Sequence, residues 1–299
     1  MKKKVLSGLL ALCLVFGSAS ALPQGAFDTA PTITASAVST ATSGKCGENV
    51  NWKLTDGKLT ISGTGEMTDY SNKNSPFCDR TDIQTVVIGS GVTSIGNRAF
   101  CNCSKLVNIT IPDSVTRIGN SALKDCESLT DVTIPSGVIS IDDYAFSGCK
   151  SLKSVTIPNS VKYLGTAAFI NCESLTSVTI PSSVTYIYKS AFSNCKSLTS
   201  VTIPNSVSSI DEYAFAFCES LKSVTIPNSV KIINEGAFYE CTNLESITIP
   251  DSVTSIGTNA LYNCPRIKSV IVPKSVTSIG EKALGYYDDN GTEKKSIGL

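Results

Sequence analysis

The sequence predicts a right-handed solenoid, mostly β, in which 23-residue coils stack to form a parallel sheet of about nine strands. Three features recur at that spacing, and a fixed repeat of about 20 to 50 residues is typical of solenoids. Eight cysteines follow it, at Cys103, Cys126, Cys149, Cys172, Cys195, Cys218, Cys241 and Cys264. An Ile-Pro pair follows it from Ile111-Pro112 to Ile249-Pro250, and an Ala-Phe pair follows it in most units from Ala99-Phe100 to Ala237-Phe238. Each coil should bury its apolar face against its neighbours, so function is expected on columns of equivalent surface residues.

The N-terminus has the features of an export signal. Three lysines at positions 2 to 4 precede an apolar run from Val5 to Phe16, and small residues end in Ala21. We therefore expect residues 1–21 to be a secretory signal peptide and the protein to be secreted or on the cell surface. Residues 22–44 are rich in Ala, Ser and Thr without a sustained period, which predicts a flexible linker.

Residues 45–76 are expected to cap the first coil with a β-hairpin. Val50, Trp52 and Leu54 alternate with polar residues, Asp56-Gly57 follows, and alternation resumes afterwards. Asp-Gly accepts the positive φ angles of a two-residue turn. The apolar side of this hairpin, with the single tryptophan, should cover core that the end of a solenoid would otherwise expose.

The solenoid itself is predicted over residues 77–284, and the unit from Cys149 shows its parts. Leu152, Val155 and Ile157 indicate a strand that ends at Pro158, because proline lacks the donor that a continued ladder would use. A second short extended segment should turn Val161 and Leu164 inward. Residues 165–169 predict a tight turn or one helical turn. The last unit departs from the pattern, and residues 285–299 predict a tail or a short cap, with a turn signal at Asn290-Gly291.

The cysteine column is expected to consist of buried thiols. Equivalent side chains in adjacent coils lie about 4.8 Å apart and point the same way, and cysteine packs there as a small hydrophobe. Disulfides between coils and metal ligation are alternatives, but a linear ladder does not converge tetrahedrally as a zinc site requires. The sequence leaves the redox state of Cys46, Cys78 and Cys101 open.

The repeated unit, Leu-x-x-Val-Thr-Ile-Pro-x-Ser-Val-x-x-Ile-Gly-x-x-Ala-Phe-x-x-Cys, resembles the bacterial leucine-rich repeats called BspA-like. The likeness covers residues 77–284, and residues 46–70 are similar to the hairpin that often precedes such repeats. The resemblance implies a leucine-rich repeat solenoid and a surface or secreted protein, a class in which some members are adhesins. The shared motif is the core, so the resemblance assigns no ligand-binding residue.

Composition excludes several functions. The chain has no histidine, which removes Ser-His-Asp and Cys-His nucleophile systems and the commonest zinc ligand. Its 25 basic and 25 acidic residues balance and are dispersed, so no nucleic-acid partner is expected. After the signal, no apolar stretch reaches the roughly 20 residues of a transmembrane segment. We expect no catalytic residue, no cofactor and no metal ligand.

The candidate ligand face is a hydroxyl array on the outer side of the strands. Threonine stands before each Ile-Pro pair, and serine stands two positions earlier in the central units. The candidate residues are Thr133, Thr156, Thr179, Thr202, Thr225, Ser154, Ser177 and Ser200. Threonine is also a good strand former, so the array has a purely structural interpretation as well. A column of alternating charge after the cysteines, from Glu127 to Glu219, is expected to pair neighbouring coils.

The candidate aromatic patch is Tyr163, Tyr186 and Tyr188. Surface tyrosines are favoured binding anchors, although partly buried packing would explain them too. A second gathering, Phe217 with Tyr239 and Tyr262, is expected near a coil corner.

We expect a secreted, non-catalytic binding module that recognises a host or matrix protein or a polysaccharide through its extended surface. The alternative is a structural spacer or assembly element without a ligand of its own. Two further alternatives fit the residues less well than a binding module or a spacer. A carboxylate-based glycoside hydrolase needs two carboxyl groups that face each other about 5 to 9.5 Å apart, whereas the acidic residues here are scattered over the repeats. An ice-binding surface is the other alternative. Ligand, binding face and oligomeric state stay open.

Overall fold

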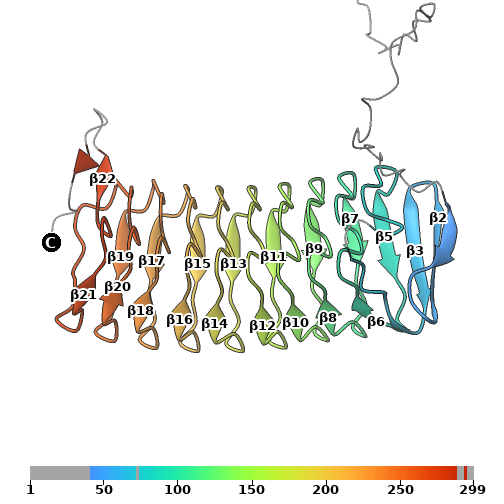
Figure 1. The fold of residues 1–299 in the computed structure, drawn as a ribbon, viewed down its shortest axis with the longest axis horizontal. Helices are drawn as coiled ribbons and strands as arrows, with labels where there is room; N and C mark the ends of the chain where they lie inside the picture. Colours follow the sequence, from blue (N-terminus) through green and yellow to red (C-terminus); the bar gives the residue numbers. More distant parts are fainter. Residues whose placement is uncertain (1–40, 72–73, 288–292, 295–299) are drawn as a thin grey trace, which may run out of the picture. The chain divides into compact units, whose positions relative to one another are not determined.

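The structure, a computed structural model, describes residues 41–71, 74–287 and 293–294. The predicted signal peptide, residues 1–21, and most of the predicted linker, residues 22–44, lie outside them. From Phe77 onward the chain winds into coils that each contribute one strand to each of two rows, as predicted (Figure 1). No helix occurs among the described residues, so the turn at residues 165–169 is tight rather than helical. Within this part of the chain there is consequently no helix that could cross a membrane.

The first row of strands forms one face of the solenoid, the strand face, on which the hydroxyl array is predicted. Its strands are β5 (Thr85–Ile88), β7 (Asn108–Thr110), β9 (Asp131–Thr133), β11 (Ser154–Thr156), β13 (Ser177–Thr179), β15 (Ser200–Thr202), β17 (Ser223–Thr225) and β19 (Ser246–Thr248). Neighbours run parallel and pair residues 23 positions apart, such as Val155 with Val178. Strands up to β15 belong to one hydrogen-bonded sheet, whereas β17 and β19 form a separate pair. The ninth strand, expected around Val270, is reduced to a single bridge at Ser269.

The second row contains shorter strands. They are β4 (Gly65–Glu66), β6 (Val92–Ile95), β8 (Arg117–Ile118), β10 (Ser140–Ile141), β12 (Tyr163–Leu164), β14 (Tyr186–Ile187), β16 (Ser209–Ile210), β18 (Ile232–Ile233), β20 (Ser255–Ile256) and β21 (Ser278–Ile279). They form two five-stranded sheets, which meet between β12 and β14. The third side of each coil has no strand but is still joined to the next coil. The amides of Ala167 and Phe169, for example, donate to the carbonyl oxygens of Lys189 and Ala191.

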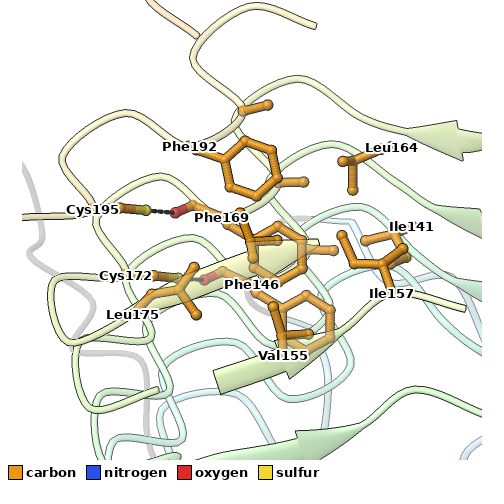
Figure 2. Packing of buried hydrophobic residues seen from close by; sticks show 14 of the residues in the cluster. Ile141, Phe146, Val155, Ile157, Leu164, Phe169, Cys172, Leu175, Phe192 and Cys195 are labelled. Atoms are coloured by element: carbon orange, nitrogen blue, oxygen red, sulfur yellow. Dashed lines mark hydrogen bonds between the residues drawn. The ribbon is translucent and has the colours of Figure 1, made fainter. Parts of the chain in front are cut away.

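The core is a set of parallel ladders. Phenylalanine rings stack from coil to coil, with Phe146 and Phe169 centroids 5.1 Å apart and their planes within 1° (Figure 2). The column cysteines are buried free thiols, as predicted. Each thiol also donates a hydrogen bond to a carbonyl oxygen of the preceding coil, as Cys172 does to Phe146 over 3.3 Å (Figure 2). This second ladder, invisible in the spacing alone, explains why cysteine rather than alanine or valine suits the position.

A β-hairpin precedes the first coil. β2 (Val50–Thr55) and β3 (Lys58–Gly63) pair antiparallel, and Asp56 and Gly57 take positive φ angles of 48° and 75°. β3 then pairs parallel with β5, so the cap continues the first sheet. A further strand, β1 (Ser43–Lys45), pairs with β2 and begins within the segment expected to be linker. Trp52 packs edge-on against Phe77, with centroids 5.2 Å apart, and covers the first coil.

Arg80 joins the cap to the first coil. It stands one repeat before Cys103, at the start of the cysteine column. Its side chain is only 2% exposed and donates to both carboxylate oxygens of Asp82 and to the carbonyl oxygen of Ala41. The guanidinium carbon also lies 6.0 Å from the Trp52 ring centroid. The thiol ladder therefore begins only at Cys103, and at the equivalent position one coil earlier Arg80 contacts the hairpin through Trp52.

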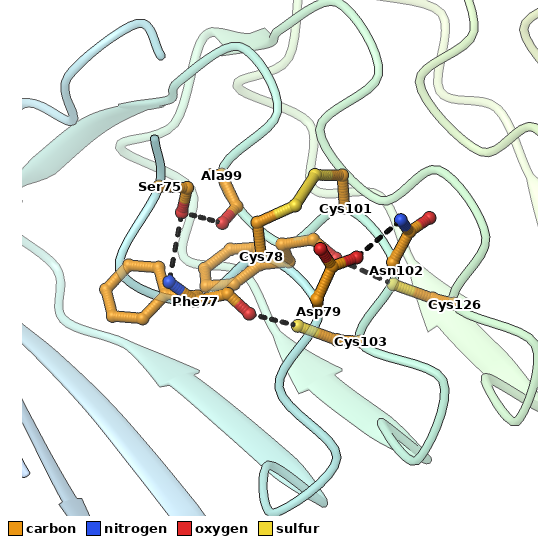
Figure 3. Close-up of a disulfide and its surroundings, with 10 residues drawn as sticks. Ser75, Phe77, Cys78, Asp79, Ala99, Cys101, Asn102, Cys103 and Cys126 are labelled. Atoms are coloured by element: carbon orange, nitrogen blue, oxygen red, sulfur yellow. Dashed lines mark hydrogen bonds between the residues drawn. A yellow bond between two sulfur atoms is a disulfide. The ribbon is translucent and has the colours of Figure 1, made fainter. Parts of the chain in front are cut away.

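A disulfide joins the first two full coils. Cys78 and Cys101 are bonded across 23 residues with their Cα atoms 4.9 Å apart (Figure 3). The bond lies beside the thiol column, which begins with Cys103. Cys46 is a buried free thiol. At the other end, β22 (Tyr286–Tyr287) and β23 (Glu293–Lys294) pair antiparallel. Its predicted turn at Asn290-Gly291 lies outside the described residues.

Candidate functional site

The strand face presents the eight candidate hydroxyl residues on one side. Thr156 is directly opposite Thr133 and Thr179, and Ser177 lies between Ser154 and Ser200. All eight candidate residues are exposed, whereas the valine between serine and threonine in each strand faces the core. Thr225 continues the threonine column in β17. The strands therefore bring the predicted face together.

Several of these hydroxyls are available to a ligand. Within the described residues, no hydrogen bond occupies the side chains of Thr156, Thr179 or Thr202. Ser154 donates to Asp131 Oδ1 over 3.3 Å, at the point where the serine column changes to a carboxylate. An array of this kind offers donors and acceptors without charge, which suits sugar hydroxyls or an extended peptide backbone.

Charged residues line the edge of the strand face. Lys150 Nζ lies 2.8 Å from Glu127 and Lys196 Nζ lies 3.6 Å from Glu173, so the alternating column pairs neighbouring coils as expected. All four side chains are substantially exposed, and such pairs contribute only about 0.2 to 1 kcal/mol each. They favour coil register and solubility.

The candidate aromatic patch forms one cluster at the seam between the two second-row sheets. Tyr188 lies between its partners, with ring centroids 5.1 Å from Tyr163 and 4.5 Å from Tyr186. Tyr163 also donates its hydroxyl hydrogen to Asp143 Oδ1 over 2.9 Å. Burial, followed by the hydrogen bond to this carboxylate, raises the pKa of Tyr163. The three rings are half-buried, so packing accounts for much of the cluster.

The seam coincides with a bulky residue. Tyr188 occupies the position that Gly165 holds one coil earlier. A Cβ atom on Gly165 would lie 2.5 Å from the Asp143 backbone nitrogen, because adjacent coils approach closely there. Asp142, Asp211 and Asn234 stand at this position in other coils without an interruption, whereas the ladder is interrupted between β12 and β14 where Tyr188, the bulkiest residue of the column, stands. The tyrosine cluster fills that interruption.

The thiol column is chemically inert. Burial raises the pKa of Cys103, Cys218 and Cys264 to about 12. At neutral pH these groups are protonated thiols, and the thiolate is the form that attacks or binds metal. In the part of the chain that the structure describes, no group of three cysteine or carboxylate side chains is placed to hold a metal ion. The cysteines therefore act in packing.

Sequence reasoning did not find a hollow at the C-terminal end of the strand face. It has a volume of about 740 Å³ and is lined by Glu245, Ser246, Pro265, Arg266, Lys268 and Ser269. It forms where the ninth strand is not completed. The departure of the last repeat from the consensus, including Pro265 and Arg266, was the signal available in the sequence.

Comparisons with known proteins agree with this architecture. A family model described as a BspA type leucine rich repeat region matches in six copies, over residues 72–199 and 166–289. A leucine-rich repeat protein from Bacteroides ovatus is 24% identical, with coverage of 79% of this chain and 90% of that chain and a TM-score of 0.50. This likeness shows the fold alone. A leucine rich cell surface protein from Faecalibacterium prausnitzii is 26% identical over 79% of this chain and 84% of its own, with a TM-score of 0.46. Comparison with curated proteins gives no match.

Proposed function

Because the chain belongs to the BspA-type leucine-rich repeat family, we propose that it is a non-catalytic binding module at the bacterial surface or outside the cell. It recognises an extracellular protein or polysaccharide through the strand face. The observation that carries this proposal is the exposed, uncharged array of serine and threonine hydroxyls repeated in register along β9, β11, β13 and β15. Repetition at one strand spacing suits a ligand that is itself extended and repetitive.

Two further observations support an extracellular location. The N-terminal sequence has the charged, apolar and small-residue segments of an export signal. The Cys78–Cys101 disulfide favours an oxidising compartment, since cytosolic proteins keep such thiols reduced.

The proposal is tested by a binding screen of residues 22–299 against matrix proteins, mucins, insoluble polysaccharides and whole cells. A variant with lysine at Thr156, Thr179 and Thr202 places three long cations on the strand face. A matched control places lysine at Thr116, Thr185 and Thr254, which are also exposed but belong to the segments that lead into the second row. Both variants add the same charge.

Binding that the strand-face variant loses and the control keeps, with both folded by circular dichroism, is the expected result. Equal binding by both variants would exclude the strand face. No binding by the native protein to any of these surfaces would favour a structural spacer instead.

A further inference from the structure

Phe217 is an exposed aromatic residue with a positive φ angle, a backbone conformation that glycine, asparagine and aspartate adopt most readily. In every coil, the residue before the column cysteine has a positive φ angle. In chain order these residues are Asn102, Asp125, Gly148, Asn171, Asn194, Phe217, Glu240 and Asn263. Asparagine, aspartate and glycine tolerate this region, whereas a bulky side chain there is an outlier. Phe217 has a φ of 58° and its side chain remains 36% exposed.

Phe217 ends a row of aromatic rings that crosses three coils. Its ring meets Tyr239 edge-on, with centroids 5.3 Å apart, and Tyr239 stacks on Tyr262 at 5.7 Å. The row runs from buried Tyr262 to exposed Phe217. At the buried end, Lys282 Nζ lies 5.7 Å from the Tyr262 ring centroid, so the row already holds one ammonium group.

Two acidic residues occupy backbone positions next to Phe217, one in the same coil and one in the next. Glu240 occupies the position equivalent to Phe217 in the next coil, and the Phe217 amide donates to the carbonyl oxygen of the adjacent Tyr239 over 2.7 Å. Glu219 follows Phe217 directly after buried Cys218 and is exposed. Within the described residues neither carboxylate has a cationic partner. The neighbouring cation of the charged column, Lys196, lies against Glu173 instead.

We propose that Phe217, Tyr239, Glu219 and Glu240 form a docking corner for a lysine or arginine side chain of a partner protein. A cation over an aromatic face is attracted by the ring quadrupole, and the carboxylates supply charge complementarity that an uncharged glycan would not use. The corner leads into the strand face, because the chain enters β17 shortly after Glu219. The proposal rests on the proposed binding function and assigns one contact of a protein ligand.

The substitution Phe217→Asn gives a sharp test because asparagine occupies this position in several other coils. It removes the exposed ring and relieves the backbone conformation, so the melting temperature should stay unchanged or rise. The probe is a fluorescein-labelled peptide of alternating arginine and leucine, and its counterpart carries glutamine in place of arginine. The matched control is Tyr144→Asn, which removes another exposed aromatic residue with a positive φ angle.

The native protein should bind the arginine peptide in low salt, measured by fluorescence anisotropy, and should bind the glutamine peptide far more weakly. Phe217→Asn should weaken arginine-peptide binding about tenfold, Glu240→Gln should weaken it less, and Tyr144→Asn should leave it unchanged. Equal binding by Phe217→Asn and the native protein would refute the docking corner, as would no binding of the arginine peptide by the native protein. If the strand-face variant loses a natural ligand that Phe217→Asn keeps, the binding function stands and the docking corner fails.

Discussion

The thiol ladder predicts how substitutions of a column cysteine rank. Cys172 is fully buried between Cys149 and Cys195 and donates to the Phe146 carbonyl oxygen over 3.3 Å. That oxygen also accepts the Cys149 amide over 3.2 Å, so it keeps one partner when the thiol is removed. Alanine and serine both delete the sulfur atom, and only serine retains a donor. Comparing the two therefore isolates the role of the hydrogen bond.

The magnitudes follow from the burial and the contact. Loss of the buried sulfur removes apolar area similar to one methylene, about 0.8 kcal/mol, and the small cavity adds about 1 kcal/mol. Cys172→Ala should therefore lower the free energy of unfolding by about 2 kcal/mol. Cys172→Ser loses the same contacts, but its hydroxyl finds the Phe146 oxygen, so it should lie within about 1 kcal/mol of alanine. A buried hydroxyl without an acceptor would cost a further 1 to 3 kcal/mol, approximately.

Urea unfolding at neutral pH, followed by far-ultraviolet circular dichroism, measures both variants against the native protein. The slope with denaturant should stay the same, so that midpoints report stability. If Cys172→Ser is less stable than Cys172→Ala by more than about 2 kcal/mol, the thiol ladder does not offer a usable acceptor. If neither substitution changes the midpoint, the column does not lie in the core.

Three further predictions concern the same scaffold. The pKa of the column thiols is raised by burial from 9.0, to about 12 for Cys103 and Cys218, so their stabilisation is complete below pH 9 and is lost as the pH rises toward 12. The free energy of unfolding, followed by urea midpoints, should fall steeply above pH 9, by about 1.4 kcal/mol per pH unit for each thiol, and a flat profile to pH 10 would contradict the buried column. Arg80→Ala should lower the free energy of unfolding by about 2 to 4 kcal/mol and speed amide hydrogen exchange in β2, and unchanged exchange there would contradict its role in the cap. Reduction of the Cys78–Cys101 disulfide should cost about 3 kcal/mol by the loop-entropy relation while the thermal transition persists, and complete unfolding by reductant alone would show that the other coils depend on it.

Most of the scaffold could be predicted because every coil repeats the same constraints. An inward position such as Val155 meets an identical residue in the next coil, so a polar side chain would be unsatisfied in both directions. The strand at Ser154–Thr156, its end at Pro158 and the burial of Cys172 all follow from that repetition. The exposure of the hydroxyl face follows as well, since side chains alternate across a strand.

Other features depend on distances that spacing does not specify. Cys78 and Cys101 also lie 23 residues apart, but only the backbone course shows that their side chains meet, whereas the neighbouring thiols donate to carbonyl oxygens. The reduction of the ninth strand to a bridge at Ser269 is likewise not visible in the spacing. The ligand is not encoded in the repeat at all, because the consensus positions are those that coils need for stacking.

Residues that depart from the consensus therefore carry information of a different kind. Arg80 replaces a column cysteine, and Asp82 and the carbonyl oxygen of Ala41 compensate for its charge within the chain. Tyr188 replaces a glycine-type position, and its contacts with Tyr163 and Tyr186 account for its ring. Phe217 replaces an asparagine-type residue, and Tyr239 covers only part of it, so both its backbone conformation and its exposed ring remain unfavourable in the isolated protein. A position whose cost is not offset inside the fold is where a partner would offset it. Tyr144 also combines a positive φ angle with an exposed ring, but Phe217 in addition ends a row of contacting aromatic rings, which is why the docking corner is inferred at Phe217.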